Sequence, residues 1–83
     1  MRRAKISVIG AGNVGRALGS AWAGAGHAVF YGVRDPESAG VREALAAAGR
    51  RALAGTLAEA AAWADVIVLA VPWAAVPETI MAL

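Results

Sequence analysis

A glycine-rich turn near the start of the chain constrains the fold more than any other feature. Lys5–Ile9 is a short run rich in β-branched residues, typical of a buried strand, and it leads directly into Gly10–Gly15, a GxGxxG pattern. From Asn13 to about Ala25 the sequence predicts a helix, whose apolar face comprises Val14, Leu18, Ala21, Trp22 and Ala25. A strand, a glycine turn and a helix in direct succession predict the first half of a strand–helix–strand unit.

The next part of the chain continues this alternation. Ala28–Val33 reads as a second strand. Asp35 followed by Pro36 predicts a helix start, with Asp35 as N-cap, and that helix runs to about Ala48. Arg51–Gly55 is predicted to be a short third strand.

The last third of the chain adds one more strand between two helices. Thr56–Glu59 matches the T-x-x-E capping box and predicts a helix that continues through Trp63. Val66–Val71 is an unbroken apolar run that ends at Pro72, as expected of a parallel strand buried on both faces. A final helix is predicted from the helical spacing of Val76, Ile80 and Leu83.

Strands that alternate with helices predict an α/β fold, a Rossmann-type doubly wound parallel sheet. Right-handed crossovers place the four strands in the order 3-2-1-4, with Val66–Val71 at an edge. That strand has the composition of a central one, so we expect the natural domain to continue beyond Leu83. Residues 1–83 would then be the N-terminal part of one NAD(P)-binding domain. An apolar edge also favours self-association, with a homodimer as the simplest product.

Composition excludes several classes of function. The chain has no cysteine and a single histidine, His27, which argues against a metal site, a disulfide framework and a thiolate nucleophile. No Ser/His/Asp set or carboxylate pair can be assembled, so no catalytic residue is assigned. The net charge is only +2 and the basic residues are scattered, so no nucleic-acid partner is expected.

No stretch of the sequence is apolar enough to suggest a membrane-spanning helix. The longest stretch without formal charge, Ala17–Val33, contains four glycines, so we expect a cytoplasmic protein without a membrane partner.

The glycine turn predicts a site for a dinucleotide. Gly10 allows the tight turn, Gly12 lets a pyrophosphate approach the backbone, and Gly15 lets the helix pack closely on the strand. Asn13 and Val14 open the helix, whose free N–H groups and positive dipole end attract phosphate.

The residues after the second strand bear on which dinucleotide binds. Asp35 lies close to the spacing of the acid that binds a ribose 2′-hydroxyl in NAD sites, although an Asp before Pro also suits an N-cap. Arg34 suits the 2′-phosphate of NADP, with Ser38 as a second phosphate ligand. The sequence therefore favours NADP, with NAD as the alternative.

Four motifs together resemble one family: Gly10–Gly15, Ala25-Gly26-His27, Gly32-Val33-Arg34 and Ala70-Val71-Pro72-Trp73. The chain resembles the NADP oxidoreductases dependent on coenzyme F420, whose N-terminal domain is shared with pyrroline-5-carboxylate reductase. In that family a Ser-Arg pair grips the 2′-phosphate; Arg34 matches the arginine, and Val33 replaces the serine. The resemblance implies coenzyme F420 as co-substrate, bound largely by later segments.

The fourth strand ends beside the crevice where open α/β sheets bind ligands. We therefore assign Val71, Pro72 and Trp73 to the cofactor site, and packing under the last helix is the alternative for Trp73. The expected function is hydride transfer between NADP(H) and a small-molecule acceptor, F420 by resemblance. An imine reductase of the pyrroline-5-carboxylate reductase type and a non-catalytic dinucleotide sensor are the alternatives.

Overall fold

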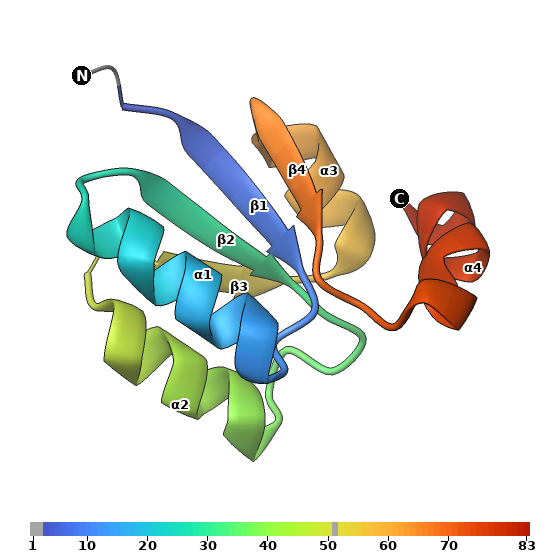
Figure 1. The fold of residues 1–83 in the computed structure, drawn as a ribbon, viewed down its shortest axis with the longest axis horizontal. Helices are drawn as coiled ribbons and strands as arrows, with labels where there is room; N and C mark the ends of the chain where they lie inside the picture. The colour runs from blue at the N-terminus through green and yellow to red at the C-terminus, as the bar shows by residue number, and fades with distance from the viewer. Residues whose placement is uncertain (1–2, 51) are drawn as a thin grey trace.

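The computed structural model describes residues 3–50 and 52–83, and the side chain of Trp73 lies outside the described part. Within these residues, four parallel strands form one sheet in the order β3-β2-β1-β4, which confirms the predicted fold class and strand order (Figure 1). The elements are β1 (Lys5–Ile9), α1 (Asn13–Gly24), β2 (Ala28–Gly32), α2 (Ala39–Ala48), β3 (Ala52–Gly55), α3 (Leu57–Trp63), β4 (Val66–Leu69), the short 3-10 helix η1 (Trp73–Ala75) and α4 (Val76–Ala82).

The register of the strands brings three chain segments to one edge of the sheet. Ile9, the last residue of β1, pairs with Gly32 on β2 and with Leu69 on β4. The segments that follow these strands therefore leave the sheet at the same level. This common edge is where a doubly wound sheet places its ligand site.

Helices cover both faces of the sheet. Helices α1 and α2 lie on one face and α3 lies on the other (Figure 1). Alternate residues of β2 divide between the two layers, because Val29 and Tyr31 belong to the core cluster under α1 and α2, whereas Phe30 packs with Ala60 on the α3 side. On the α3 side the buried Ser7 hydroxyl donates a 2.8 Å hydrogen bond to the Ala60 carbonyl oxygen, which joins β1 to α3.

The predicted buried face of α1 is wrong by one residue position. The structure buries a stripe of small residues, Gly15, Gly19 and Ala23, whereas Val14 is 66% exposed. Large side chains on this stripe would hold the helix away from the sheet. Leu18 and Trp22 instead flank the stripe and are half-buried.

Two further helix predictions need correction. Helix α2 begins at Ala39 with Ser38 as its N-cap, and not at Asp35. The Asp35 carboxylate accepts a hydrogen bond from the Glu37 N–H and so closes a local turn ahead of the helix. In α4 the predicted apolar residue Ile80 is 53% exposed, and Thr79 is the residue that the structure buries.

Strand β4 is shorter and more exposed than predicted. It ends at Leu69, although the Ala70 N–H still donates a 2.9 Å hydrogen bond to the Ile9 carbonyl oxygen, and Val66 and Ile67 are 48% and 41% exposed. Burial on both faces is therefore wrong for this strand. Of β3, the predicted first residue Arg51 lies outside the described residues, and the remainder, Ala52–Gly55, is confirmed.

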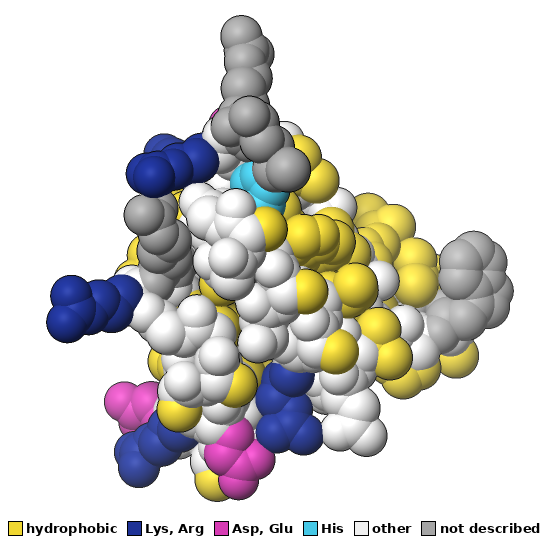
Figure 2. All heavy atoms as spheres, turned by 60° about the vertical axis from the view of Figure 1, so that its left-hand side comes forward, with side chains coloured by type: hydrophobic (Ala, Val, Ile, Leu, Met, Phe, Trp, Pro, Cys, Tyr) yellow, Lys and Arg dark blue, Asp and Glu magenta, His cyan; other side chains and the backbone are white. Residues whose placement is uncertain are grey.

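Hydrophobic and charged side chains gather at different places on one face of the molecule. Figure 2 shows one face, on which hydrophobic side chains gather towards the right of the view and Lys and Arg side chains lie at the left and below. Among the described residues, the large hydrophobic side chains that are exposed are Val14, Leu53, Val66, Ile67, Ile80 and Met81.

Candidate functional site

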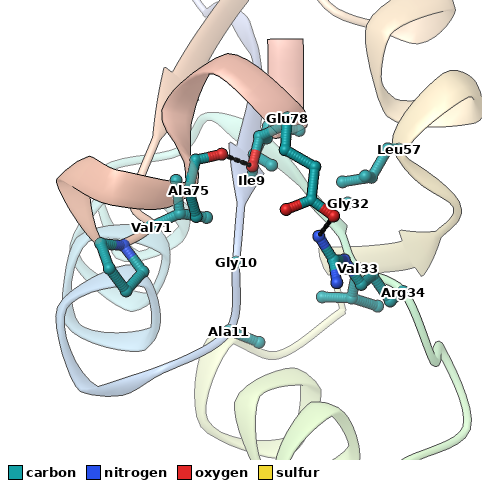
Figure 3. Close-up of a pocket in the computed structure, with 12 residues that line it drawn as sticks. Ile9, Gly10, Ala11, Gly32, Val33, Arg34, Leu57, Val71, Ala75 and Glu78 are labelled. Carbon is teal, nitrogen blue, oxygen red and sulfur yellow. Dashed lines mark hydrogen bonds and ion pairs between the residues drawn. The ribbon is translucent and has the colours of Figure 1, made fainter. Parts of the chain in front are cut away.

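A cavity of about 410 Å³ opens at the carboxyl ends of the strands (Figure 3). The turn after β1, the end of β2, the start of α3 and the segment from Val71 into α4 surround it. Its lining residues are Ile9, Gly10, Ala11, Gly32, Val33, Arg34, Leu57, Val71, Pro72, Ala75, Glu78 and Thr79.

A second cavity of about 430 Å³ lies between the first turn of α1 and the end of β4. It is lined by Gly12, Asn13, Val14, Leu69, Ala70, Val71 and Pro72. Val71 and Pro72 belong to both linings, so the two cavities adjoin along the segment that follows β4. The residues of the glycine turn are divided between them, with Gly10 and Ala11 in the first lining and Gly12, Asn13 and Val14 in the second.

The glycine turn has the backbone geometry that its sequence requires. Gly10 has a φ of +104°, which L side chains rarely adopt, and a Cβ there would lie 2.7 Å from the Ala70 carbonyl oxygen. A Cβ on Gly15 would overlap the Gly10 carbonyl oxygen, so α1 meets the turn at a distance that only glycine permits. These contacts give Gly10 the geometry of a tight turn and Gly15 that of a close helix contact, while the assignment of both residues to a cofactor site stays a prediction.

Gly12 differs from its two neighbours in the motif. A Cβ on Gly12 would meet no protein atom within 4 Å, so the space beside this residue is open to a ligand. Its φ of −75° suits any residue, which means that backbone strain gives no reason for a glycine here. The close approach of a ligand to the backbone would explain why this position is a glycine.

The amino terminus of α1 faces this open space without a side-chain cap. Gly12 is the N-cap residue, and within the described residues no side chain accepts a hydrogen bond there. The first intrahelical bond runs from the Arg16 N–H to the Gly12 carbonyl oxygen (2.9 Å). The preceding N–H groups of the first turn are therefore the orphan donors that bind anions at helix starts.

The Asn13 side chain is held within α1. Its Oδ1 accepts a 3.0 Å hydrogen bond from Arg16, whose guanidinium also forms a 2.9 Å ion pair with Glu43 of α2. This network joins α1 to α2 beside the turn. The bond to Arg16 uses only the acceptor oxygen of Asn13, so its backbone N–H and its side-chain NH₂ group are the parts of this residue suited to an anion.

Arg34 lies at the mouth of the first cavity, two residues after the end of β2. Its guanidinium donates a 2.8 Å hydrogen bond to the carboxylate of Glu78, which comes from the first turn of α4 (Figure 3). Both side chains are exposed, at 70% and 71%. The predicted ligand of a 2′-phosphate is thus paired with an acid that comes from 44 residues further along the chain.

Ser38 has a local structural role. Its hydroxyl oxygen accepts a hydrogen bond from the Val41 N–H and caps α2. Among the described residues, the linings of the two cavities do not include Ser38. Its assignment as a second phosphate ligand stays a prediction.

The segment after β4 supplies two predicted residues and several unpredicted ones. Val71 and Pro72 line both cavities, whereas the side chain of Trp73 lies outside the described part of the structure. Glu78 and Thr79 line the first cavity, and the Thr79 hydroxyl donates a 2.7 Å hydrogen bond to the Ala75 carbonyl oxygen. The residues next to Glu78 in the sequence do not predict a place for it in the site. Its partner Arg34 lies 44 residues away in the chain, and the pairing of the strands brings the two residues to the same cavity.

Two other features are absent from residues 3–50 and 52–83. Neither a cluster of three or more His, Cys, Asp or Glu side chains suited to a metal ion nor a helix long and apolar enough to cross a membrane occurs there.

Comparisons with known proteins agree with this geometry. The family described as NADP oxidoreductase coenzyme F420-dependent matches residues 5–83. A crystal structure of a candidate F420-dependent NADP reductase from Arthrobacter sp. FB24 superposes with a TM-score of 0.84 and 31% sequence identity. That superposition covers 95% of the present chain and 38% of the Arthrobacter chain. No curated protein matches.

Proposed function

The chain belongs to the family of coenzyme F420-dependent NADP oxidoreductases, and on that premise we propose that it forms the NADP(H)-binding part of such an enzyme. The observation that carries the proposal is the open space beside Gly12, at the uncapped start of α1, in the lining of the second cavity. A pyrophosphate there accepts hydrogen bonds from the backbone N–H groups of the first turn. The residues present therefore fit a dinucleotide.

The two cavities are proposed to take the two halves of the cofactor. The adenosine half occupies the first cavity, where Arg34 stands at the mouth, and the nicotinamide half extends into the second, beside Val14 and Leu69. An arginine guanidinium binds phosphate through charge-assisted, often bidentate hydrogen bonds. Arg34 is the basis on which we propose NADP rather than NAD as the preferred cofactor.

The reduced nicotinamide supplies the hydride, and the protein binds and orients it. Val71 and Pro72 form the wall common to both cavities and so limit how the ligand crosses the turn. The chain spans 38% of the solved structure that it matches. Hydride transfer to coenzyme F420, by the whole protein, is therefore proposed from family membership.

A pair of glycine substitutions tests the binding site. Gly12→Ala adds a methyl group to the open space and is expected to weaken NADPH and NADH binding by about tenfold, the worth of one hydrogen bond to a charged group. Its cost to stability is at most about 1 kcal/mol, that of a poorer N-cap. Gly24→Ala, at the other end of α1, is the matched control, because a Cβ there also meets nothing within 4 Å. Binding is measured by quenching of tryptophan fluorescence.

Arg34→Glu, measured in the same titration, separates NADP from NAD. The variant is expected to lose at least tenfold in NADPH affinity and to change NADH affinity by less than threefold, because only NADPH carries the 2′-phosphate. Equal losses for both nucleotides would contradict the role of Arg34. A folded wild-type protein that binds neither nucleotide would overturn the proposed function itself.

A further inference from the structure

We propose that Glu78 determines how strongly the site prefers NADP to NAD, because it competes with the 2′-phosphate for Arg34. This inference rests on the proposed function and assigns a role to a residue of α4 that lies outside the glycine motif. It concerns the Arg34–Glu78 ion pair at the mouth of the first cavity, visible in Figure 3.

The first step is the contact itself. Arg34 and Glu78 come from different elements, and their nitrogen and oxygen atoms lie 2.8 Å apart. Each side chain is about 70% exposed, so neither is held in place by surrounding protein. An exposed pair of this kind is only weakly stable, and a stronger partner can separate it.

The second step is the comparison of ligands. A phosphate monoester carries a charge of about −1.5 to −2 and three acceptor oxygens, so it binds a guanidinium more strongly than one carboxylate does. Binding of NADP therefore replaces the Arg34–Glu78 contact. NAD has a neutral hydroxyl at the same position, which leaves the contact intact.

The third step is the fate of the displaced carboxylate. Glu78 belongs to the first turn of α4, where the helix dipole stabilises a negative charge. Its attachment to the helix keeps the carboxylate at the cavity mouth, close to the incoming phosphate of like charge. Competition for Arg34 and repulsion of the phosphate both weaken NADP binding and spare NAD.

The test uses ligands that contain only the adenosine half. Adenosine 2′,5′-bisphosphate and adenosine 5′-monophosphate differ by the 2′-phosphate alone, and calorimetric titration gives the affinity of each. Glu78→Gln is expected to bind the bisphosphate about threefold to tenfold more tightly than wild type, as expected for removal of one exposed charge interaction. Affinity for the monophosphate should change by less than about twofold, within the noise of such an exposed substitution.

Glu37→Gln is the matched control, because Glu37 is an exposed acid three residues from Arg34 in the sequence and the substitution changes the net charge equally. It is expected to leave the ratio of the two affinities unchanged. Adding Arg34→Gln to Glu78→Gln tests the route of the effect. If Glu78 acts mainly through competition for Arg34, most of its gain for the bisphosphate is lost in that background, where only the direct repulsion between Glu78 and the phosphate remains. A gain that Arg34→Gln leaves undiminished would contradict the competition.

The outcomes separate this inference from the proposed function. A wild-type protein that prefers the bisphosphate, with the same preference in Glu78→Gln, would overturn the role of Glu78 alone. An equal gain for both ligands would also overturn it, since a general loosening of the cavity does not depend on the 2′-phosphate. A wild-type protein that binds neither adenosine ligand nor NADPH would overturn both. Thermal denaturation of each variant verifies that it is folded.

Discussion

At the scale of single residues, glycine permits the close approach of α1 to the sheet. Tyr31 of β2 is fully buried, and a Cβ on Gly19 would overlap its hydroxyl group and ring. The Tyr31 hydroxyl has no hydrogen-bond partner among the described residues, and burial raises the pKa of this tyrosine, while the charge of Arg16 acts in the opposite direction. Gly19 and Tyr31 are therefore complementary in shape, and neither tolerates added volume.

Gly19→Ala is expected to destabilise the protein by about 1–3 kcal/mol, as overpacking of a core usually does. Gly24→Ala provides the contrast within the same helix, because open space surrounds that position. Alanine is the better helix former, so Gly24→Ala should stabilise the protein by about 0.5–1 kcal/mol. Urea denaturation measures the change in the free energy of unfolding of each variant. A Gly19→Ala variant as stable as wild type would show that Tyr31 can move aside.

At the scale of elements, α3 begins with the capping box that the sequence predicts. The Thr56 hydroxyl accepts a hydrogen bond from the Glu59 N–H (3.1 Å), and the Glu59 carboxylate accepts one from the Thr56 N–H (2.8 Å). The bond from the Thr56 backbone, more than that from its side chain, lowers the pKa of Glu59. The start of a seven-residue helix is thus secured by its own first turn.

Thr56→Ala is expected to cost about 1 kcal/mol of stability, the usual worth of an N-cap. Urea denaturation of the variant and of the wild type measures this difference in the free energy of unfolding.

Glu59→Gln is expected to remove a pH dependence of stability. Because the folded-state pKa of Glu59 is lowered, its ionised form stabilises the fold above the ordinary glutamate pKa, and that contribution is lost as pH falls through the folded-state value. Thermal denaturation between neutral and acidic pH should therefore show a shallower acid loss in Glu59→Gln. Parallel curves for wild type and variant would contradict the capping role of the carboxylate.

At the scale of the whole molecule, one edge of the sheet combines apolar side chains with unpaired backbone. Within the described residues β4 pairs only with β1, and Val66 is 48% exposed on it. Such an edge is a template for another strand. The opposite edge of the sheet is β3, which among the described residues pairs with β2 alone. It carries Leu53, which is 50% exposed.

We expect the 83-residue chain to self-associate through β4 as its concentration rises. Val66→Lys should reduce that association, because a lysine on an edge strand opposes pairing with another chain. Leu53→Lys places the same charge on the β3 edge and should leave association unchanged. Sedimentation velocity over a range of concentrations distinguishes the two variants. A wild-type chain that remains monomeric throughout would contradict the prediction.

Local sequence pattern predicted the order and type of the elements because each has a signal within a few residues. The glycine turn, the Thr56–Glu59 capping box and the apolar run at Val66 all depend on neighbours in the chain. The errors arise where two local signals compete or where packing decides. Asp35 and Ser38 are both good caps, and only the turn that Asp35 closes leaves Ser38 as the N-cap of α2.

The sequence by itself determined the α/β alternation, the strand order and the glycine turn, since helix starts, strand patterns and crossover handedness are short-range or universal constraints. Only the tertiary structure decided which face of α1 is buried, how far β4 is exposed and which acid meets Arg34. Those outcomes depend on the strand register and on how closely the layers approach. Glu78 reaches Arg34 because Ile9 is level with both Gly32 and Leu69, a relation between distant segments that no local pattern contains.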